Sequence, residues 1–283
     1  MTQQTLERTV RQTWAFVFRG FHLSRRYFSW EVVFSFYALT SSATVALIGV
    51  AAGDYQLTLT LVVGSLLWNF LSKLYQEIAL SIALERWEGT LEYTFMAPIS
   101  RLVHLCGVSL AAMIYSLMHT AVVLTGLLLF TRLTLAGANL RGVLVVLLVS
   151  TLAFVGLGLM AAVLPLMSPE RGAEATNIFQ GLLLLISGVY YPVEVLPRWL
   201  QPLSYISPAT YTLSACRKLT GISNAASTEQ RLVGAPLSSV VPELAVLVLM
   251  GVVMIPLGPV GLRPRRDLGQ AHWKAEAHGL RFL

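Results

Sequence analysis

The chain has 283 residues, of which 55% are hydrophobic and only 12% are charged, and its mean hydropathy is +0.68. A soluble domain carries about 25% charged residues, so the composition excludes an ordinary soluble protein and predicts an all-α integral membrane protein. The net charge of +6 does not indicate nucleic-acid binding, because the basic residues stand mainly at the ends of apolar runs, as membrane-flanking bases do.

Residues 1–29 predict a cytoplasmic amphipathic helix that lies in the membrane interface. Five apolar residues recur at helical spacing, and basic residues fall largely off this stripe. The stripe consists of Leu6, Val10, Trp14, Val17 and Phe21. The alternative is a plain basic flank ahead of the first span, where Arg25 and Arg26 stand.

Residues 30–261 predict a domain of six transmembrane helices, because a span needs about 20 mostly apolar residues. The six segments are 30–52, 57–80, 102–130, 141–166, 174–190 and 239–261. The first two spans are joined by only four residues, which predicts a tight hairpin. The final residues, 262–283, are expected to form a cytoplasmic tail.

The proline-rich stretch after the fifth span predicts an external re-entrant element over about residues 191–215. Each of its prolines forbids a regular helical continuation, so a broken pair of half-helices is expected. These prolines are Pro192, Pro197, Pro202 and Pro208. Non-helical backbone at membrane depth needs cover from protein or water, which favours a pore mouth over a lipid-facing surface.

The distribution of Lys and Arg predicts the orientation. With the N-terminus inside, the inner segments 1–29, 85–101, 167–173 and 262–283 hold most of these bases, whereas the short outer loops hold almost none. The outer region 191–238 holds four, but a long loop counts less. The positive-inside rule then places both termini in the cytoplasm.

Polar residues within the spans suggest a pathway for cargo. Ser65, Asn69 and Ser72 share one narrow face of the second span with Thr58 and Gln76. The alternative reading is hydrogen bonding between helices. Tyr115 and His119 on the third span are further pathway candidates. A lone histidine is more often a packing residue than a ligand, and no metal-ligand spacing accompanies it.

Charged residues near the spans do not indicate an ion-coupled carrier. Glu31, Glu77, Glu174 and Glu243 lie towards predicted span ends rather than at the midplane, where such carriers need an ionisable group. Lys73 and Glu77 stand one turn apart and are expected to pair. There is no phosphate-binding loop, catalytic motif or metal motif, so we expect this chain to bind no cofactor.

A polar segment, residues 85–101, interrupts the apolar runs between the second and third spans. In one continuous helix Glu85, Glu88 and Glu92, at i, i+3 and i+7, would share a face, and Pro98 would end the element. A charged, helix-competent element between two spans is typical of a surface shown to a soluble partner. The alternative is a solvated loop helix.

Two stretches resemble ABC type-2 transporter permeases. Glu85-Arg86-Trp87-Glu88-Gly89-Thr90-Leu91-Glu92, closing on Met96-Ala97-Pro98-Ile99, resembles the cytoplasmic loop after that family's second span. Ser187-Gly188-Val189-Tyr190-Tyr191-Pro192, Leu196-Pro197-Arg198-Trp199-Leu200 and Ile206-Ser207-Pro208-Ala209-Thr210-Tyr211 resemble its motif around the fifth span. The resemblance covers nearly the whole chain.

The resemblance implies the permease subunit of an ATP-driven exporter in a bacterial cytoplasmic (inner) membrane. Two copies of a separate ABC ATPase would bind ATP and Mg²⁺, and a second permease chain, identical or homologous, would complete the complex among membrane lipids. Residues 85–97 would form the coupling helix. The expected ATPase contacts are Glu85, Arg86, Glu88, Gly89, Thr90, Leu91, Glu92 and Met96.

The resemblance also implies an outer exit ringed by Tyr190, Tyr191, Trp199 and Tyr205. The alternative is a plain interfacial belt, which the amphipathic rings of these residues also suit. The expected cargo is amphipathic: a lipid-like molecule, a drug or a glycolipid. The runner-up is a lipid-handling membrane enzyme with an external active site. Its titratable candidates are Glu194, Glu229, Arg217 and Lys218. A third reading is a structural subunit that binds a partner without transporting.

Overall fold

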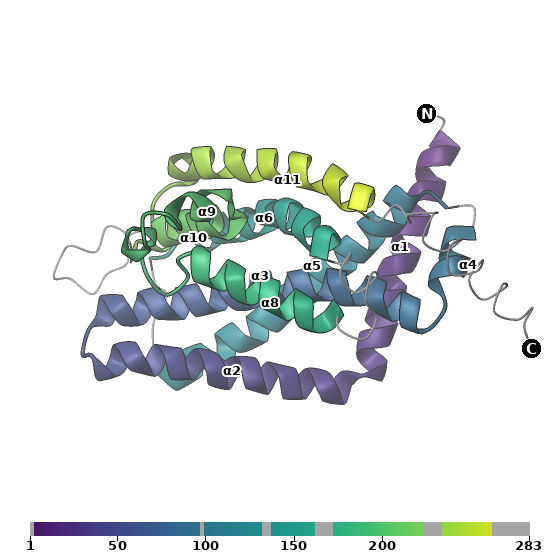
Figure 1. Ribbon diagram of the computed structural model, residues 1–283. Coiled ribbons are helices and arrows are strands. Elements are labelled where there is room, and N and C mark those ends of the chain that lie inside the picture. Colours follow the sequence, from purple (N-terminus) through teal and green to yellow (C-terminus); the bar gives the residue numbers. More distant parts are fainter. Residues whose placement is uncertain (1–2, 97–98, 132–136, 162–171, 223–233, 262–283) are drawn as a thin grey trace, which may run out of the picture.

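The computed structural model describes residues 3–96, 99–131, 137–161, 172–222 and 234–261, which form helices and turns (Figure 1). In chain order the helices are α1 Gln3–Arg26, α2 Phe28–Ala51, α3 Tyr55–Trp87, α4 Leu91–Met96, α5 Arg101–Thr131, α6 Leu140–Ala161, α8 Gly172–Ile186, η1 Val193–Val195, α9 Gln201–Ile206, α10 Pro208–Thr220, η3 Leu237–Val240 and α11 Val241–Gly261. The long helices form one bundle, and α1 crosses one end of it (Figure 1).

Five helical segments among the described residues are long and apolar enough to cross a membrane, which confirms five of the six predicted spans. They are Phe28–Ala51, Tyr55–Glu85, Val103–Phe130, Leu140–Ala161 and Leu237–Leu257. The predicted fifth span, 174–190, corresponds to α8, which has 15 residues and ends at Ile186. At about 1.5 Å per residue α8 is shorter than the roughly 30 Å hydrocarbon core. A sixth span therefore stays a prediction.

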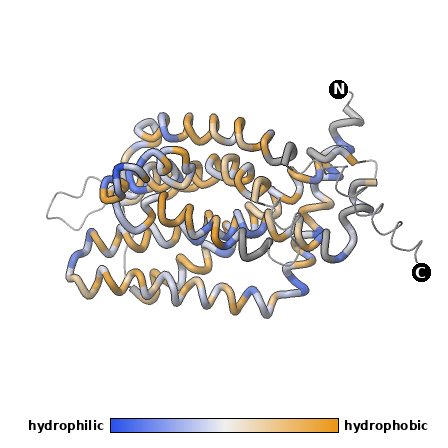
Figure 2. The backbone as a smooth tube through the Cα atoms, in the orientation of Figure 1, coloured by the Kyte–Doolittle hydropathy of each residue, from blue (hydrophilic) through white to orange (hydrophobic). Residues whose placement is uncertain are grey.

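The two ends of the bundle carry different elements. α1, α4 and the last turns of α11 lie at one end, and the hairpin between α2 and α3 lies at the other, together with α9 (Figure 1). Hydrophilic residues gather mainly at these ends, while the middle of the bundle is mostly hydrophobic (Figure 2). The two elements predicted to be cytoplasmic, α1 and α4, thus share one end of the molecule.

The central helix of the bundle is α3, which contacts α2, α5, α6, α8 and α10. Its apolar residues face several neighbours at once, so the helix is hydrophobic nearly all round over its middle turns. Phe70, Leu71, Leu74, Tyr75 and Ile78 are almost completely buried. A displacement of α3 would therefore change its contacts with all five of these helices.

Two glycines allow α2 and the turn after α8 to approach α3 closely. A Cβ at Gly49 would lie 2.5 Å from Cα of Thr58, and a Cβ at Gly64 would lie 2.4 Å from the backbone oxygen of Val189. Small residues permit such close backbone contacts between helices in membranes. Larger side chains at these positions would push the helices apart.

The proline-rich stretch forms short broken helices, as predicted. Pro208 is the first residue of α10, Pro202 stands in the first turn of α9, and Pro192 precedes η1. Proline is tolerated at these starts because its missing N–H has no intrahelical partner there. Re-entry of this element into the bilayer stays a prediction.

The orientation of α1 corrects one residue of the predicted stripe. Val17 is buried in the bundle, whereas Val10, Trp14, Phe18 and Phe21 are more than half exposed. The side chain of Leu6 lies outside the described residues. α1 packs against α5, where a Cβ at Gly107 would lie 2.6 Å from Cβ of Phe16. Tertiary contact with α5, which periodicity cannot reveal, therefore turns Val17 inward.

Candidate functional site at the junction of α1, α3 and α5

The polar segment 85–97 is not one helix. α3 continues to Trp87, Gly89 adopts a left-handed conformation with φ of 69°, and α4 begins at Leu91. The N–H of Thr90 donates to the backbone oxygen of Glu85 over 2.9 Å, the bond that closes a helix at a left-handed glycine. The prediction that Glu85, Glu88 and Glu92 share one helical face is therefore wrong.

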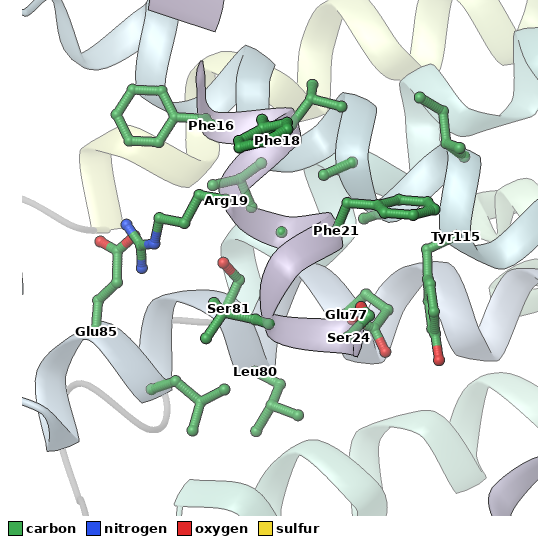
Figure 3. A pocket seen from close by; sticks show the side chains of 18 of the residues that line it. Phe16, Phe18, Arg19, Phe21, Ser24, Glu77, Leu80, Ser81, Glu85 and Tyr115 are labelled. Carbon is green, nitrogen blue, oxygen red and sulfur yellow. The ribbon is translucent and has the colours of Figure 1, made fainter. Parts of the chain in front are cut away.

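Glu85 points into the protein instead of towards solvent. Its side chain is 1% exposed, and its Oε1 lies 2.7 Å from Nη1 of Arg19 and 3.1 Å from Nε2 of His104. The ring of Phe16 packs edge-on against His104, with 4.9 Å between ring centroids. Figure 3 shows Arg19 of α1 reaching towards Glu85. A buried carboxylate needs such partners because burial of an unpaired charge is costly.

We call Arg19, Glu85 and His104 the Glu85 node. It joins the end of α3 to α1 and to the first turn of α5. Sequence reasoning missed two of its members, since Arg19 was noted only among the basic residues off the apolar stripe of residues 1–29 and His104 was not singled out. The available signal in the sequence was Glu85 at the end of the second apolar run, followed by His104 in the first turn of the third apolar run.

The surface beyond the Glu85 node exposes apolar side chains. Tyr93 and Met96 of α4 are 75% and 83% exposed, and Glu88 is exposed in the connection before them. Thr90 donates through Oγ1 to the backbone oxygen of Glu85 over 3.3 Å. The side chains of Arg86, Leu91 and Glu92 lie outside the described residues. We call Glu88, Tyr93 and Met96 the α4 surface.

The predicted pathway residues on α3 make hydrogen bonds inside the chain. Asn69 donates through Nδ2 to Oγ of Ser42 on α2 over 2.6 Å. Ser65 and Ser72 donate to backbone oxygens of α3 itself. These bonds favour the helix-to-helix alternative for Asn69, and a role of the three residues in transport stays a prediction.

An ionic cluster lies among α2, α3 and α5. Nζ of Lys73 is 2.8 Å from Oε1 of Glu77, as the spacing predicted, and 3.5 Å from Oε2 of Glu31. The same Nζ lies 4.8 Å from the ring centroid of Tyr115. His119 is buried, with its Nδ1 3.2 Å from Oγ of Ser35 on α2. Tyr115 and His119 thus face the packed interior between helices.

A cavity of about 370 Å³ lies among α1, α3 and α5. Apolar side chains from all three helices line it. Figure 3 shows Glu85 and Arg19 on one side of the cavity and Glu77, Ser24 and Tyr115 on the other. The cavity therefore connects the Glu85 node with the ionic cluster.

The proline-rich element is anchored by ionic and polar contacts of the residues that flank it. Nη2 of Arg217 donates to the backbone oxygens of Gly188 and Val189 over 3.0 and 2.7 Å, and Lys218 pairs with Glu243 of α11. Tyr190 and Tyr191 are partly buried after α8, whereas Trp199 is exposed before α9. Whether these three aromatics form an exit is a prediction.

These contacts weaken the enzyme alternative. Two of its four titratable candidates have structural partners, because Arg217 ties α10 to the turn after α8 and Lys218 ties it to α11. Glu194 is exposed, and Glu229 lies outside the described residues. The part of the chain that the structure describes holds no group of three or more His, Cys, Asp or Glu side chains placed to bind a metal.

Comparison with known proteins gives one family and two relatives. The family model described as ABC-2 type transporter matches residues 6–220, which is most of the chain. The relatives are the proteins named probable multidrug ABC transporter permease YbhR of Escherichia coli K12 and of Escherichia coli O157:H7. Each is 28% identical over 130 residues, or 46% of this chain. The match spans 35% of each relative's length, about a third.

Proposed function

Because this chain belongs to the ABC-2 type transporter family, we propose that it is the membrane-spanning permease subunit of an ATP-driven exporter. Two copies of a separate ABC ATPase bind ATP and Mg²⁺, and a second permease chain, identical or homologous, completes the complex. The permease itself is non-catalytic. It spans a bacterial cytoplasmic membrane with both termini inside.

The Glu85 node is the observation that carries this proposal. A transporter driven by a soluble ATPase needs a rigid connection between the docking surface and the spans. The backbone of α3 runs directly into α4 through residues 88–90, and the buried carboxylate of Glu85 ties this point to α1 and α5. A displacement of α4 therefore moves three helices together, because bonds in a buried site hold their geometry.

The α4 surface has the chemistry of a protein-docking site. Exposed aromatic and methionine side chains are enriched at protein interfaces, and they supply apolar area at the centre of a contact. Glu88 adds a carboxylate that pairs with basic residues of the ATPase. This docking role includes Gly89, whose lack of a side chain allows close backbone approach, and nothing lies within 4 Å of a Cβ placed there.

An exposed polar pair supports a cargo pathway beside α3. Nε2 of Gln76 donates to Oε1 of Gln180 on α8 over 2.8 Å, and Gln76 is exposed on the bundle surface. Polar side chains within the membrane rarely face lipid; they face protein or a water-filled cavity. This face is where the second permease chain and the cargo would meet.

The cargo is amphipathic: lipid-like, a drug or a glycolipid. The name of both relatives describes them as probable multidrug permeases, which supports such a cargo over an inorganic ion. Stimulation of ATP hydrolysis by lipidic compounds but not by ions would test this class. Stimulation by ions alone would reject it.

Co-purification tests the transport assembly. The chain is extracted from its native membranes in mild detergent, and its partners are identified by mass spectrometry. We expect a roughly stoichiometric ATPase with a phosphate-binding loop, and the charge reversal Glu88→Lys should reduce its recovery. A folded chain recovered alone, or only with enzymes of lipid metabolism, would contradict the proposal.

A further inference from the structure

The cavity behind α1 combines a hydrophobic wall with carboxylates at its edge. Phe18 and Phe21 of α1, Leu80 and Leu84 of α3, and Ile114 of α5 contribute to its lining. Ligand sites are usually concave, mostly apolar and equipped with a few polar groups that orient the ligand. Its volume of about 370 Å³ is within the range for small-molecule pockets.

The charged groups around this cavity do not balance. Glu77, Glu85 and Arg19 line it directly, so the lining has one more carboxylate than cations. The neighbouring pair of Glu31 and Lys73 adds one charge of each sign and leaves this excess unchanged. Among the Glu, Arg and Lys side chains named here, three carboxylates thus stand beside two cations. A cationic ligand would complete the balance.

Glu77 is the carboxylate that a ligand can reach. Its side chain is 25% exposed, and only its Oε1 is close to Lys73, whereas the Glu85 side chain is 1% exposed. Figure 3 places Ser24 beside Glu77, and Tyr115 lines the same end of the cavity. The polar end of the cavity is therefore built from three helices.

We propose that this cavity binds an amphipathic amine, with the ammonium group at Glu77 and the apolar part against Phe18, Phe21 and Leu80. An ammonium donates charge-assisted hydrogen bonds to a carboxylate, which are about twice as strong as neutral ones. An anionic lipid is disfavoured because its phosphate would meet the excess carboxylate. The binding site stands on the cavity alone, and only its role as a cargo site depends on the proposed transport function.

The location of this site links it to the proposed connection with the ATPase. Arg19 and Glu85 line the same cavity, so an occupant contacts the Glu85 node as well as Glu77. In the complete transporter, a bound amine would stiffen the connection between α1 and α3 and stimulate ATP hydrolysis. Binding and stimulation are separate readouts.

Binding is tested with the full chain in lipid nanodiscs and a dansyl-labelled long-chain alkylamine, detected by fluorescence. Its alcohol and carboxylate analogues serve as uncharged and anionic probes. We expect the amine to bind at least about tenfold more tightly than either analogue, since the charged hydrogen bond is lost. Equal binding of the three probes, or tighter binding of the carboxylate, would overturn the proposal.

The variant Glu77→Gln removes the charge from the cavity and keeps the side-chain size. Its matched control is Glu31→Gln, which removes the other carboxylate beside Lys73 but does not line the cavity. We expect about tenfold weaker amine binding for Glu77→Gln, unchanged alcohol binding, and little change for Glu31→Gln. Equal losses in the two variants would show that the cluster acts only structurally and would overturn the proposal.

A second pair of variants tests the apolar wall. Phe21→Ala should weaken binding of the amine and the alcohol alike, whereas Phe36→Ala, on the exposed face of α2, should not. Equal effects at the two positions would indicate nonspecific partition into lipid. If amine binding fails while an ATPase still co-purifies, this inference is rejected and the proposed function stands. If amine binding persists but no ATPase co-purifies, the proposed function is rejected and this inference stands.

Discussion

Arg19 and Glu85, far apart in the sequence, form an ion pair of 2.7 Å in which the carboxylate is buried. The pair lies directly before the turn at Gly89, and the same carboxylate oxygen also contacts His104. Three helices are thus fixed at the point where the surface element α4 begins. In the proposed transporter, this arrangement would carry a displacement of α4 to the spans.

Neutralising the buried Glu85 should destabilise the fold more than neutralising the exposed Glu88. Glu85→Gln leaves Arg19 and His104 without their charged partner in a buried site, and we expect a loss of about 2 kcal/mol in the free energy of unfolding. The exposed Glu88→Gln should cost less than about 0.5 kcal/mol. Thermal melting of detergent-solubilised protein, followed by size exclusion, measures both.

The double variant Arg19→Gln with Glu85→Gln provides the control for this prediction. Because the two residues interact directly, the effects of the single variants should not add. Strictly additive losses, or a loss at Glu88 equal to that at Glu85, would contradict the Glu85 node.

Close packing at Gly64 predicts a second effect on stability. Gly64→Ala places a Cβ 2.4 Å from the backbone oxygen of Val189, which also accepts a hydrogen bond from Arg217, so we expect a loss of about 1–3 kcal/mol. Gly181→Ala is the matched control, because nothing lies within 4 Å of its Cβ. The melting temperatures of the two variants measure the difference; similar values would argue against the close approach of α3 to the turn after α8.

Cys216 on α10 should resist alkylation in the folded protein. It is fully buried, and burial raises the pKa of its thiol to about 12, so the reactive thiolate is disfavoured at pH 8. In a Cys106→Ala background, maleimide should label the chain rapidly only after denaturation. Rapid labelling of the native protein, followed by mass spectrometry, would show that α10 is not packed against α6 and α11.

The sequence predicted those features that depend on local pattern. Hydropathy placed five candidate spans close to their observed bounds, and the prolines marked the broken helices between α8 and α11, because both signals are local to the segment that they describe. The pair of Lys73 and Glu77 followed from their spacing of one helical turn. Glu31, the third member of that cluster, comes from α2 and could not be placed by spacing on α3.

The errors arose where distant segments decide the outcome. Glu85 was expected to face a partner, but Arg19 and His104 from other helices draw it inside. Helical spacing assumed that residues 85–97 were continuous, whereas Gly89 adopts a conformation that ends a helix. Val17 was placed with Val10 on one stripe, although packing against α5 buries only Val17.

Docking of the ATPase on the α4 surface is the central claim, and site-specific photo-crosslinking tests it most directly. A photoreactive phenylalanine replaces Tyr93 in the purified complex, with Tyr37 on the exposed face of α2 as the control position. The account predicts that position 93 cross-links to the ATPase, with a yield that changes when ATP is added, and that position 37 does not. A co-purifying ATPase that cross-links to position 37 but not to position 93 would contradict it.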